Sequence, residues 1–234
     1  MECIILAGGM GTRLQSVVSD VPKCMAPVAG RPFLHYLLET LEQNGFTHVI
    51  LSLGYKHEVI GEWIKGFQTS LQISSVIEKQ PLGTGGAVKF ALSQANQEEV
   101  FILNGDTFLG IDYPEMLAIH RDTQAKATLA LKKMTNFDRY GLVETDCQTH
   151  KINAFREKQF CESGLINGGV YLINRKELRE YPEKFSLEKD FFETIVPSGG
   201  LSGYISDGYF IDIGIPADYS QAQIDFRDGK YKTL

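Results

Sequence analysis

The stretch CIILAGGMGTRL at residues 3–14 decides the fold that the rest of the sequence predicts. Residues 3–7 form an apolar run with the length of a buried strand, and Gly8, Gly9 and Gly11 follow it closely. Glycines let a backbone approach a phosphate and turn its N–H groups toward it, because no Cβ is in the way. The stretch therefore predicts a strand that opens into a phosphate-binding loop.

Two well-known phosphate loops do not fit this stretch. A Walker P-loop requires GxxxxGK followed by Ser or Thr, and no such lysine follows these glycines. A dinucleotide-binding fingerprint requires GxGxxG, and counted from Gly9 its third glycine would fall on Leu14. A strand-to-loop turn without a ligand explains the glycines but leaves the cations Arg13 and Lys23 unexplained.

The composition is that of a globular protein which binds small ligands. The chain has 234 residues, of which 43% are hydrophobic and 22% charged, so it can bury a sizeable core. Its net charge of −6 lacks the basic character of nucleic-acid-binding proteins, so no nucleic-acid partner is expected.

No apolar run reaches the roughly 18 to 20 residues that span a membrane, and residues 3–7 are too short for a signal peptide. The four cysteines show neither metal-site nor disulfide spacing. We expect a cytoplasmic protein with reduced thiols and no membrane partner, and the sequence leaves a homo-oligomer open.

Strands and helices are expected to alternate in the first half of the chain. Runs of strand character occur at 3–7, 48–53, 73–77 and 100–103, and helical spacing occurs at 32–45, 58–67 and 85–95. After Ala127, strand-like runs dominate, at 128–133, 142–144, 170–173, 204–205 and 210–213. Such a pattern is typical of βα units followed by antiparallel pairs. The sequence therefore predicts an α/β fold with a Rossmann-like, mixed but mainly parallel central sheet flanked by helices. We expect one domain, residues 1–234, with lobes of about 1–125 and 126–234.

Further motifs follow the glycine loop in a characteristic order. They are Pro22-Lys23, Pro81–Ala87 (PLGTGGA), Asn104-Gly105-Asp106, Glu157-Lys158, Asn167–Tyr171 (NGGVY) and Phe210–Gly214 (FIDIG). Together with residues 6–14, they resemble the sugar 1-phosphate nucleotidyltransferase family, from Cys3 to about Gln223. The resemblance implies the nucleotide-diphospho-sugar transferase fold, in which the first lobe binds the nucleotide and the second binds the sugar phosphate.

The resemblance also implies a reaction in which a sugar 1-phosphate oxygen attacks the α-phosphorus of a nucleoside triphosphate and pyrophosphate leaves. Two anions must meet, so the site needs cations and in-line positioning more than it needs an acid or a base. By resemblance, Arg13 and Lys23 are the catalytic residues. Arg13 would neutralise the β- and γ-phosphates, and Lys23 would hold the α-phosphate as charge develops.

Two aspartates are the expected ligands of Mg²⁺, the cofactor that such a reaction calls for. Asp106 follows a predicted strand at its carboxyl end, where open α/β sheets bind ligands, although Asp is also a common turn residue. Asp212 lies within the apolar run 210–213, where a carboxylate is costly to bury unless it is paired or bound to metal.

The nucleotide is expected to lie against the glycine loop and the stretch from Glu78 to Ala87. The residues implied by the resemblance are Leu6, Ala7, Gly8, Gly9, Gly11, Thr12, Pro81, Gly83 and Thr84. Glu78 occupies the position where family members specific for uracil or thymine generally carry glutamine. A carboxylate only accepts hydrogen bonds, and guanine presents N1–H and N2–H₂ side by side, so Glu78 predicts GTP. The alternative for Glu78 is a solvated strand end.

The sugar phosphate is expected to bind to Gly141, Glu157, Lys158 and Asn167, again by resemblance. Without it, Glu157 and Lys158 are equally typical of a solvated charged pair. The whole-chain pattern most resembles guanylyltransferases that act on D-glycero-α-D-manno-heptose 1-phosphate, and mannose 1-phosphate or another sugar 1-phosphate is the alternative substrate. A non-catalytic relative that senses nucleotide sugars stays open as another class, although Arg13, Lys23 and both aspartates are present.

Overall fold

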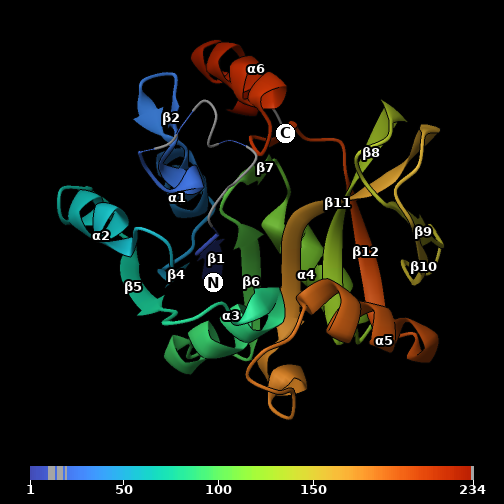
Figure 1. The fold of residues 1–234 in the computed structure, drawn as a ribbon. Coiled ribbons are helices and arrows are strands. Elements are labelled where there is room, and N and C mark those ends of the chain that lie inside the picture. The colour runs from blue at the N-terminus through green and yellow to red at the C-terminus, as the bar shows by residue number, and fades with distance from the viewer. Residues whose placement is uncertain (10–13, 15–17, 19, 233–234) are drawn as a thin grey trace.

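The computed structural model describes residues 1–9, 14, 18 and 20–232, and within them a nine-stranded mixed sheet forms the centre of the molecule (Figure 1). One half of this sheet is parallel. It consists, from the edge inward, of β5 (Gln72–Ile77), β4 (His48–Leu53), β1 (Glu2–Ala7) and β6 (Glu99–Asn104). Cys3 pairs with Val49 on one side and with Phe101 on the other, so the carboxyl ends of the strands meet at one edge.

The strand β11 (Cys161–Asn174) joins this parallel half to an antiparallel half. Its last residues pair with β6, and nearly its whole length pairs with β8 (Ala127–Phe137). Beyond them lie β9 (Leu142–Thr145), β10 (Ile152–Arg156) and β12 (Leu201–Ser206), of which β12 is parallel to β8. Strands from before and after residue 125 thus belong to one sheet. The expected division into two lobes near that residue stays a prediction. The predicted α/β fold with a mixed sheet is confirmed.

The helices cover both faces of the sheet, as the alternation of buried side chains along its strands requires. Cys3 and Ile5 belong to one hydrophobic cluster, together with Leu37 from a helix, whereas Ile4 belongs to a second cluster, together with Val88. The α-helices are α1 (Phe33–Gln43), α2 (His57–Lys65), α3 (Gly83–Ala91), α4 (Tyr113–Asp122), α5 (Glu193–Ile195) and α6 (Pro216–Arg227). No helix in the described ranges is both long enough and apolar enough to cross a bilayer.

Short elements complete the described chain. Two small antiparallel sheets pair β7 (Thr107–Leu109) with β13 (Phe210–Asp212), and β2 (Pro27–Val28) with β3 (Arg31–Pro32). A π-helix spans Leu187–Phe192. Short 3₁₀ helices span Lys23–Met25, Leu92–Gln94, Arg175–Leu178, Val196–Ser198 and Lys230–Lys232.

The chain between Glu183 and Phe185 packs against the first turn of α3 with almost no space between them. An added Cβ at Gly85 would lie 2.2 Å from the ring of Phe185, and one at Gly86 would lie 2.2 Å from the carbonyl oxygen of Glu183. The N–H of Gly85 donates to the carbonyl of Phe185 at 3.0 Å. These glycines are therefore required by the packing of the chain on itself.

This packing predicts opposite effects for two Gly→Ala substitutions in helices. Gly86→Ala should lower the free energy of unfolding by about 1–3 kcal/mol, because the new methyl group overlaps a backbone carbonyl. Gly61→Ala in α2 places its Cβ in open space. This substitution should raise the free energy of unfolding by up to about 1 kcal/mol, the usual cost of glycine in a helix. Urea denaturation of both variants checks this, and a Gly86→Ala variant as stable as the parent would contradict the close contact.

Candidate functional site

A cleft of about 590 Å³ opens at the carboxyl ends of the parallel strands. It is lined by Leu6, Gly8, Gly9, Gly54, Tyr55, Glu78, Lys79, Gln80, Pro81, Gly83, Thr84, Ala87, Asn104, Asp106 and Glu188. Most of the nucleotide-binding residues expected from the sequence are in this list, while Ala7 is buried in the core below it. Three expected residues, Gly11, Thr12 and Arg13, lie outside the described residues.

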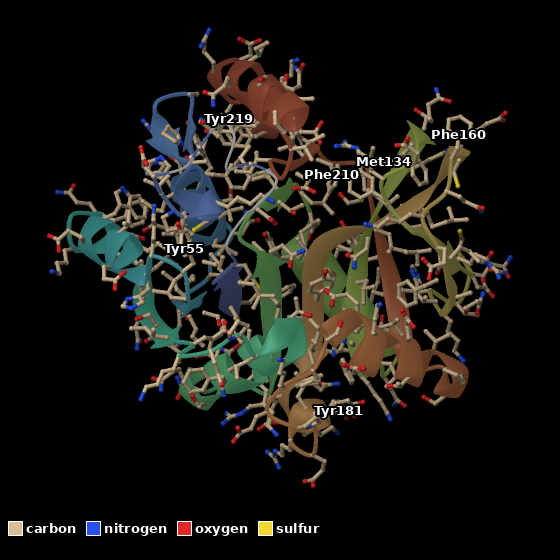
Figure 2. The ribbon with its side chains drawn as sticks, viewed as in Figure 1. Tyr55, Met134, Phe160, Tyr181, Phe210 and Tyr219 are labelled. Atoms are coloured by element: carbon tan, nitrogen blue, oxygen red, sulfur yellow. The ribbon has the colours of Figure 1, made fainter. Side chains whose placement is uncertain are left out.

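The floor of the cleft is made where β1 and β4 end. The N–H of Tyr55 donates to the carbonyl of Gly8 at 3.2 Å, and an added Cβ at Gly54 would lie 2.8 Å from that same oxygen. Only glycine at position 54 allows the two strand ends to approach this closely. Figure 2 labels Tyr55, which follows β4, and Phe210, the first residue of β13, which pairs with Leu109 of β7.

Glu78 follows β5 and is half-buried on the wall of the cleft. Its carboxylate accepts two hydrogen bonds, one from the hydroxyl of Ser52 to Oε1 and one from the N–H of Leu82 to Oε2, each at 3.2 Å. This geometry differs from that of a solvated strand end, because both oxygens are held by the protein. A carboxylate fixed at the edge of a cleft can accept a pair of hydrogen bonds from a ligand.

The start of α3 contributes Gly83 and Thr84 to the cleft, but both also serve the packing of the chain. Gly83 has a positive φ of 74°, and an added Cβ would lie 2.5 Å from the carbonyl oxygen of Phe185. The hydroxyl of Thr84 donates to Glu188 at 2.7 Å and accepts from the N–H of Leu187 at 2.9 Å. Glycine at position 83 is therefore required by the close approach of Phe185.

Glu188 is a residue of the cleft that no sequence motif indicated. It lies in the first turn of the π-helix, which Ser186 caps by accepting from the N–H of Lys189 at 3.2 Å. The hydroxyls of Thr84 and Ser186 both donate to its Oε2. In the sequence, Ser186-x-Glu188 is a pattern typical of a helix start. This pattern does not indicate that the Glu188 carboxylate faces the cleft.

Lys23 brings the two expected metal ligands together. The short β7–β13 pair places Asp212 opposite Thr107, directly beside Asp106. The ammonium of Lys23 forms an ion pair with Asp106, and its Nζ lies 3.6 Å from Oδ1 of Asp212. Only 12% of the Lys23 side chain is exposed, so the three charges are partly shielded from solvent.

The geometry around Asp212 leaves no room for another side chain. Its Oδ1 accepts from the N–H of Gly214 at 2.7 Å. An added Cβ at Gly214 would lie 2.5 Å from Nζ of Lys23 and 2.7 Å from Oδ1 of Asp212. The glycine that ends the motif 210–214 therefore keeps the lysine and the aspartate in contact.

The donor set of Asp106 and Asp212 fits Mg²⁺. Their hard oxygen atoms converge on one cationic group, and Mg²⁺ in proteins is commonly held by one or two carboxylates together with substrate phosphates. The part of the chain that the structure describes has no cluster of three or more His, Cys, Asp or Glu side chains suited to a metal ion. Burial raises the pKa of the neighbouring Cys24 thiol to about 12, which makes a thiolate ligand unfavourable at neutral pH.

Asn167 lies on β11, close to the inner end of the cleft. Its Oδ1 accepts from the N–H of Gly169 at 2.9 Å, and its Nδ2 donates to the hydroxyl of Tyr171 at 3.2 Å. Gly169 has a positive φ of 75°, and an added Cβ would lie 3.0 Å from the side-chain nitrogen of Asn104, a residue of the cleft. Burial raises the pKa of the Tyr171 phenol well above its usual range, so this network stays neutral.

The other residues expected to bind the sugar phosphate lie along β9 and β10. An added Cβ at Gly141 would lie 2.8 Å from the carbonyl oxygen of Arg156, so Gly141 is close to the end of β10. Glu157 and Lys158 follow that end and are exposed. The structure thus brings Gly141, Glu157 and Lys158 near one another, and none of them is among the residues that line the nucleotide cleft.

Comparisons with known proteins show the family of the chain. A family model described as nucleotidyl transferase matches residues 2–229. A D-glycero-α-D-manno-heptose 1-phosphate guanylyltransferase from Aneurinibacillus thermoaerophilus is 48% identical over 225 residues, which cover 95% of this chain and 97% of the relative. One from Campylobacter jejuni is 45% identical over 221 residues, which cover 94% and 97%.

A similar structure has also been solved. The crystal structure of HddC from Yersinia pseudotuberculosis, complexed with GMP-PN, matches with a TM-score of 0.85 and 38% sequence identity. The match covers 96% of this chain and 99% of that one. By sequence and by structure over almost its whole length, the chain belongs to the nucleotidyl transferase family.

Proposed function

We propose that this protein transfers GMP from GTP to D-glycero-α-D-manno-heptose 1-phosphate, giving GDP-heptose and pyrophosphate. The observation that carries the proposal is the placement of Lys23, Asp106 and Asp212 at the same sheet edge as Glu78. Asp106 and Glu78 line the same cleft, which supports one site for both the triphosphate and the base. The two guanylyltransferase relatives, each covered over 97% of its length, support the choice of both substrates.

In this mechanism the protein supplies charge and alignment. Lys23 contacts the α-phosphate as an oxygen of the sugar phosphate attacks in line, and Arg13 is proposed to neutralise the departing pyrophosphate. Asp106 and Asp212 would hold Mg²⁺, which when bound offsets the negative charge of the phosphates. The ion pairs of Lys23 orient its ammonium before substrate arrives, so little reorganisation is needed at the moment of reaction.

Glu78 is proposed to select the base. Its two oxygens would accept from N1–H and N2–H₂ of guanine, whereas uracil offers one N–H between two carbonyls and would place a carbonyl oxygen against the carboxylate. Two acceptors that face each other repel and form no hydrogen bond, so this contact would disfavour uracil.

The sugar phosphate is proposed to bind between Asn167 and the group of Gly141, Glu157 and Lys158. Lys158 would pair with its phosphate, and Glu157 would accept from sugar hydroxyls.

All four cysteines are free thiols, which supports a cytoplasmic location, since reduced cysteines are typical of that compartment. A homo-oligomer stays a prediction.

The proposed reaction requires three components together. Pyrophosphate should be released from GTP only when D-glycero-α-D-manno-heptose 1-phosphate and Mg²⁺ are both present, because the sugar phosphate is the nucleophile. Mannose 1-phosphate and glucose 1-phosphate are the comparison substrates, and kcat/KM should be highest for the heptose. A higher kcat/KM for mannose 1-phosphate would reassign the sugar, and binding of GDP-heptose without turnover would indicate a non-catalytic relative.

The metal assignment predicts a specific loss. Asp106→Asn should lower kcat by about a hundredfold or more, because it removes one of two carboxylates proposed to hold Mg²⁺. Asp122→Asn, at an exposed position at the end of α4, is the matched control and should leave kcat unchanged. Steady-state rates of pyrophosphate release measure both, and full activity of Asp106→Asn would remove Asp106 from the metal site.

The base assignment predicts a change in selectivity. Glu78→Gln should reduce the ratio of kcat/KM for GTP to that for UTP by about tenfold or more, since a hydrogen bond to a charged group contributes about 1.5–3 kcal/mol. Initial rates with each nucleotide at fixed heptose 1-phosphate give the ratio. If the ratio is unchanged, Glu78 does not read the base.

A further inference from the structure

Ser52 is a buried hydroxyl within an otherwise apolar strand end. It lies on β4, in the sequence HVILSL, and its exposed fraction is 0%. A hydroxyl removed from water in this way needs a hydrogen-bond partner, because leaving it unpaired costs free energy. The partner of Ser52 therefore shows what the residue does.

The register of the sheet directs Ser52 toward the cleft. Ser52 pairs with Val76 on β5, and Glu78 follows Val76 by two residues, so both point to the same face of the sheet. The hydroxyl of Ser52 donates to Oε1 of Glu78 at 3.2 Å. A buried residue of the scaffold is thus linked directly to a carboxylate that lines the nucleotide cleft.

The carboxylate of Glu78 is confined on two further sides. The N–H of Leu82, at the start of α3, donates to Oε2 at 3.2 Å. An added Cβ at Gly8 would lie 3.1 Å from Oε1 and 3.3 Å from the backbone nitrogen of Gly54. The end of β1 therefore forms a wall against which the carboxylate lies, and Ser52 and Leu82 fix its two oxygens separately.

We propose that Ser52 is a positioning residue for base selection, which orients the Glu78 carboxylate for guanine. This inference rests on the proposed use of GTP. A glutamate side chain has several freely rotating bonds, and ordering it on binding costs affinity unless the free protein already holds it. Each carboxylate oxygen has two lone pairs, so an oxygen that accepts from Ser52 or Leu82 can still accept from guanine.

The test compares GTP with inosine triphosphate, which lacks the N2 amino group of guanine. Ser52→Ala should lower kcat/KM for GTP by about ten- to a hundredfold, the range expected for one hydrogen bond to a charged group. The loss for inosine triphosphate should be smaller, because its base offers one donor fewer to the carboxylate. The ratio of the two kcat/KM values is therefore the readout, and a purely structural defect would lower both equally.

Ser202→Ala is the matched control. Ser202 is a buried strand serine, 1% exposed, whose hydroxyl donates to Thr123 at 3.0 Å away from the cleft. Ser202→Ala should lower the melting temperature about as much as Ser52→Ala does. It should leave the ratio of kcat/KM for GTP to that for inosine triphosphate unchanged. Ser52→Cys keeps the volume with a weak donor and should change the ratio in the same direction, so it replaces the alanine variant if that variant does not fold.

A double-mutant cycle completes the test. In a Glu78→Gln background, Ser52→Ala should change the ratio by less than about twofold, because the residue acts through Glu78. One outcome would separate the two proposals: the parent prefers GTP, Glu78→Gln abolishes that preference, and Ser52→Ala and Ser52→Cys leave it unaltered. The inference about Ser52 would then be wrong, while the proposed function stands. If the parent itself shows no preference for GTP over inosine triphosphate and UTP, the proposed function fails, and the role of Ser52 fails with it.

Discussion

The contact of the Lys23 ammonium with the carboxylates of Asp106 and Asp212 is the interaction on which the candidate site depends. Partly buried charges are stabilised by opposite charges beside them, and here one ammonium lies between two carboxylates. They come from distant parts of the chain, and the short β7–β13 pair is what brings the two aspartates to adjacent positions. A site of this kind forms only when β13 has paired with β7.

The same sheet edge carries Glu78, the residue proposed to select the base. There the constraint is space rather than charge, since Gly8 and Gly54 let the ends of β1 and β4 touch and leave room for the carboxylate of Glu78. At the start of α3, glycines serve the packing of residues 183–185 onto the helix, so part of the motif 81–87 maintains the wall of the cleft. Strand ends therefore hold both the charged groups and the proposed base-selecting carboxylate, as precise sites require.

Three of the parallel strands were predictable because β1, β4 and β6 are short, largely apolar runs, and His48–Leu53 has the bounds that the sequence indicated. The strands predicted at 128–133 and 170–173 are longer in the structure, since β8 and β11 continue into an exposed ladder where polar residues replace the apolar pattern. The sequence does not indicate the helices α4 and α6, because their buried faces are small and their polar content is high.

Motifs in the sequence name three residues of the candidate site, Lys23, Asp106 and Asp212. They do not name Ser52 and Glu188, because the contacts of these two residues depend on strand register and on the packing of distant segments.

The central claim is that Lys23 acts on the α-phosphate as a fixed charge, while the sugar phosphate attacks directly. The most direct test is the stereochemistry at the α-phosphorus, using GTP in which one α-phosphate oxygen is replaced by sulfur in a single configuration. One in-line displacement predicts a GDP-heptose with inverted configuration at that phosphorus, read by ³¹P NMR. Retention of configuration would contradict the account, because it requires two displacements through a covalent guanylyl-enzyme.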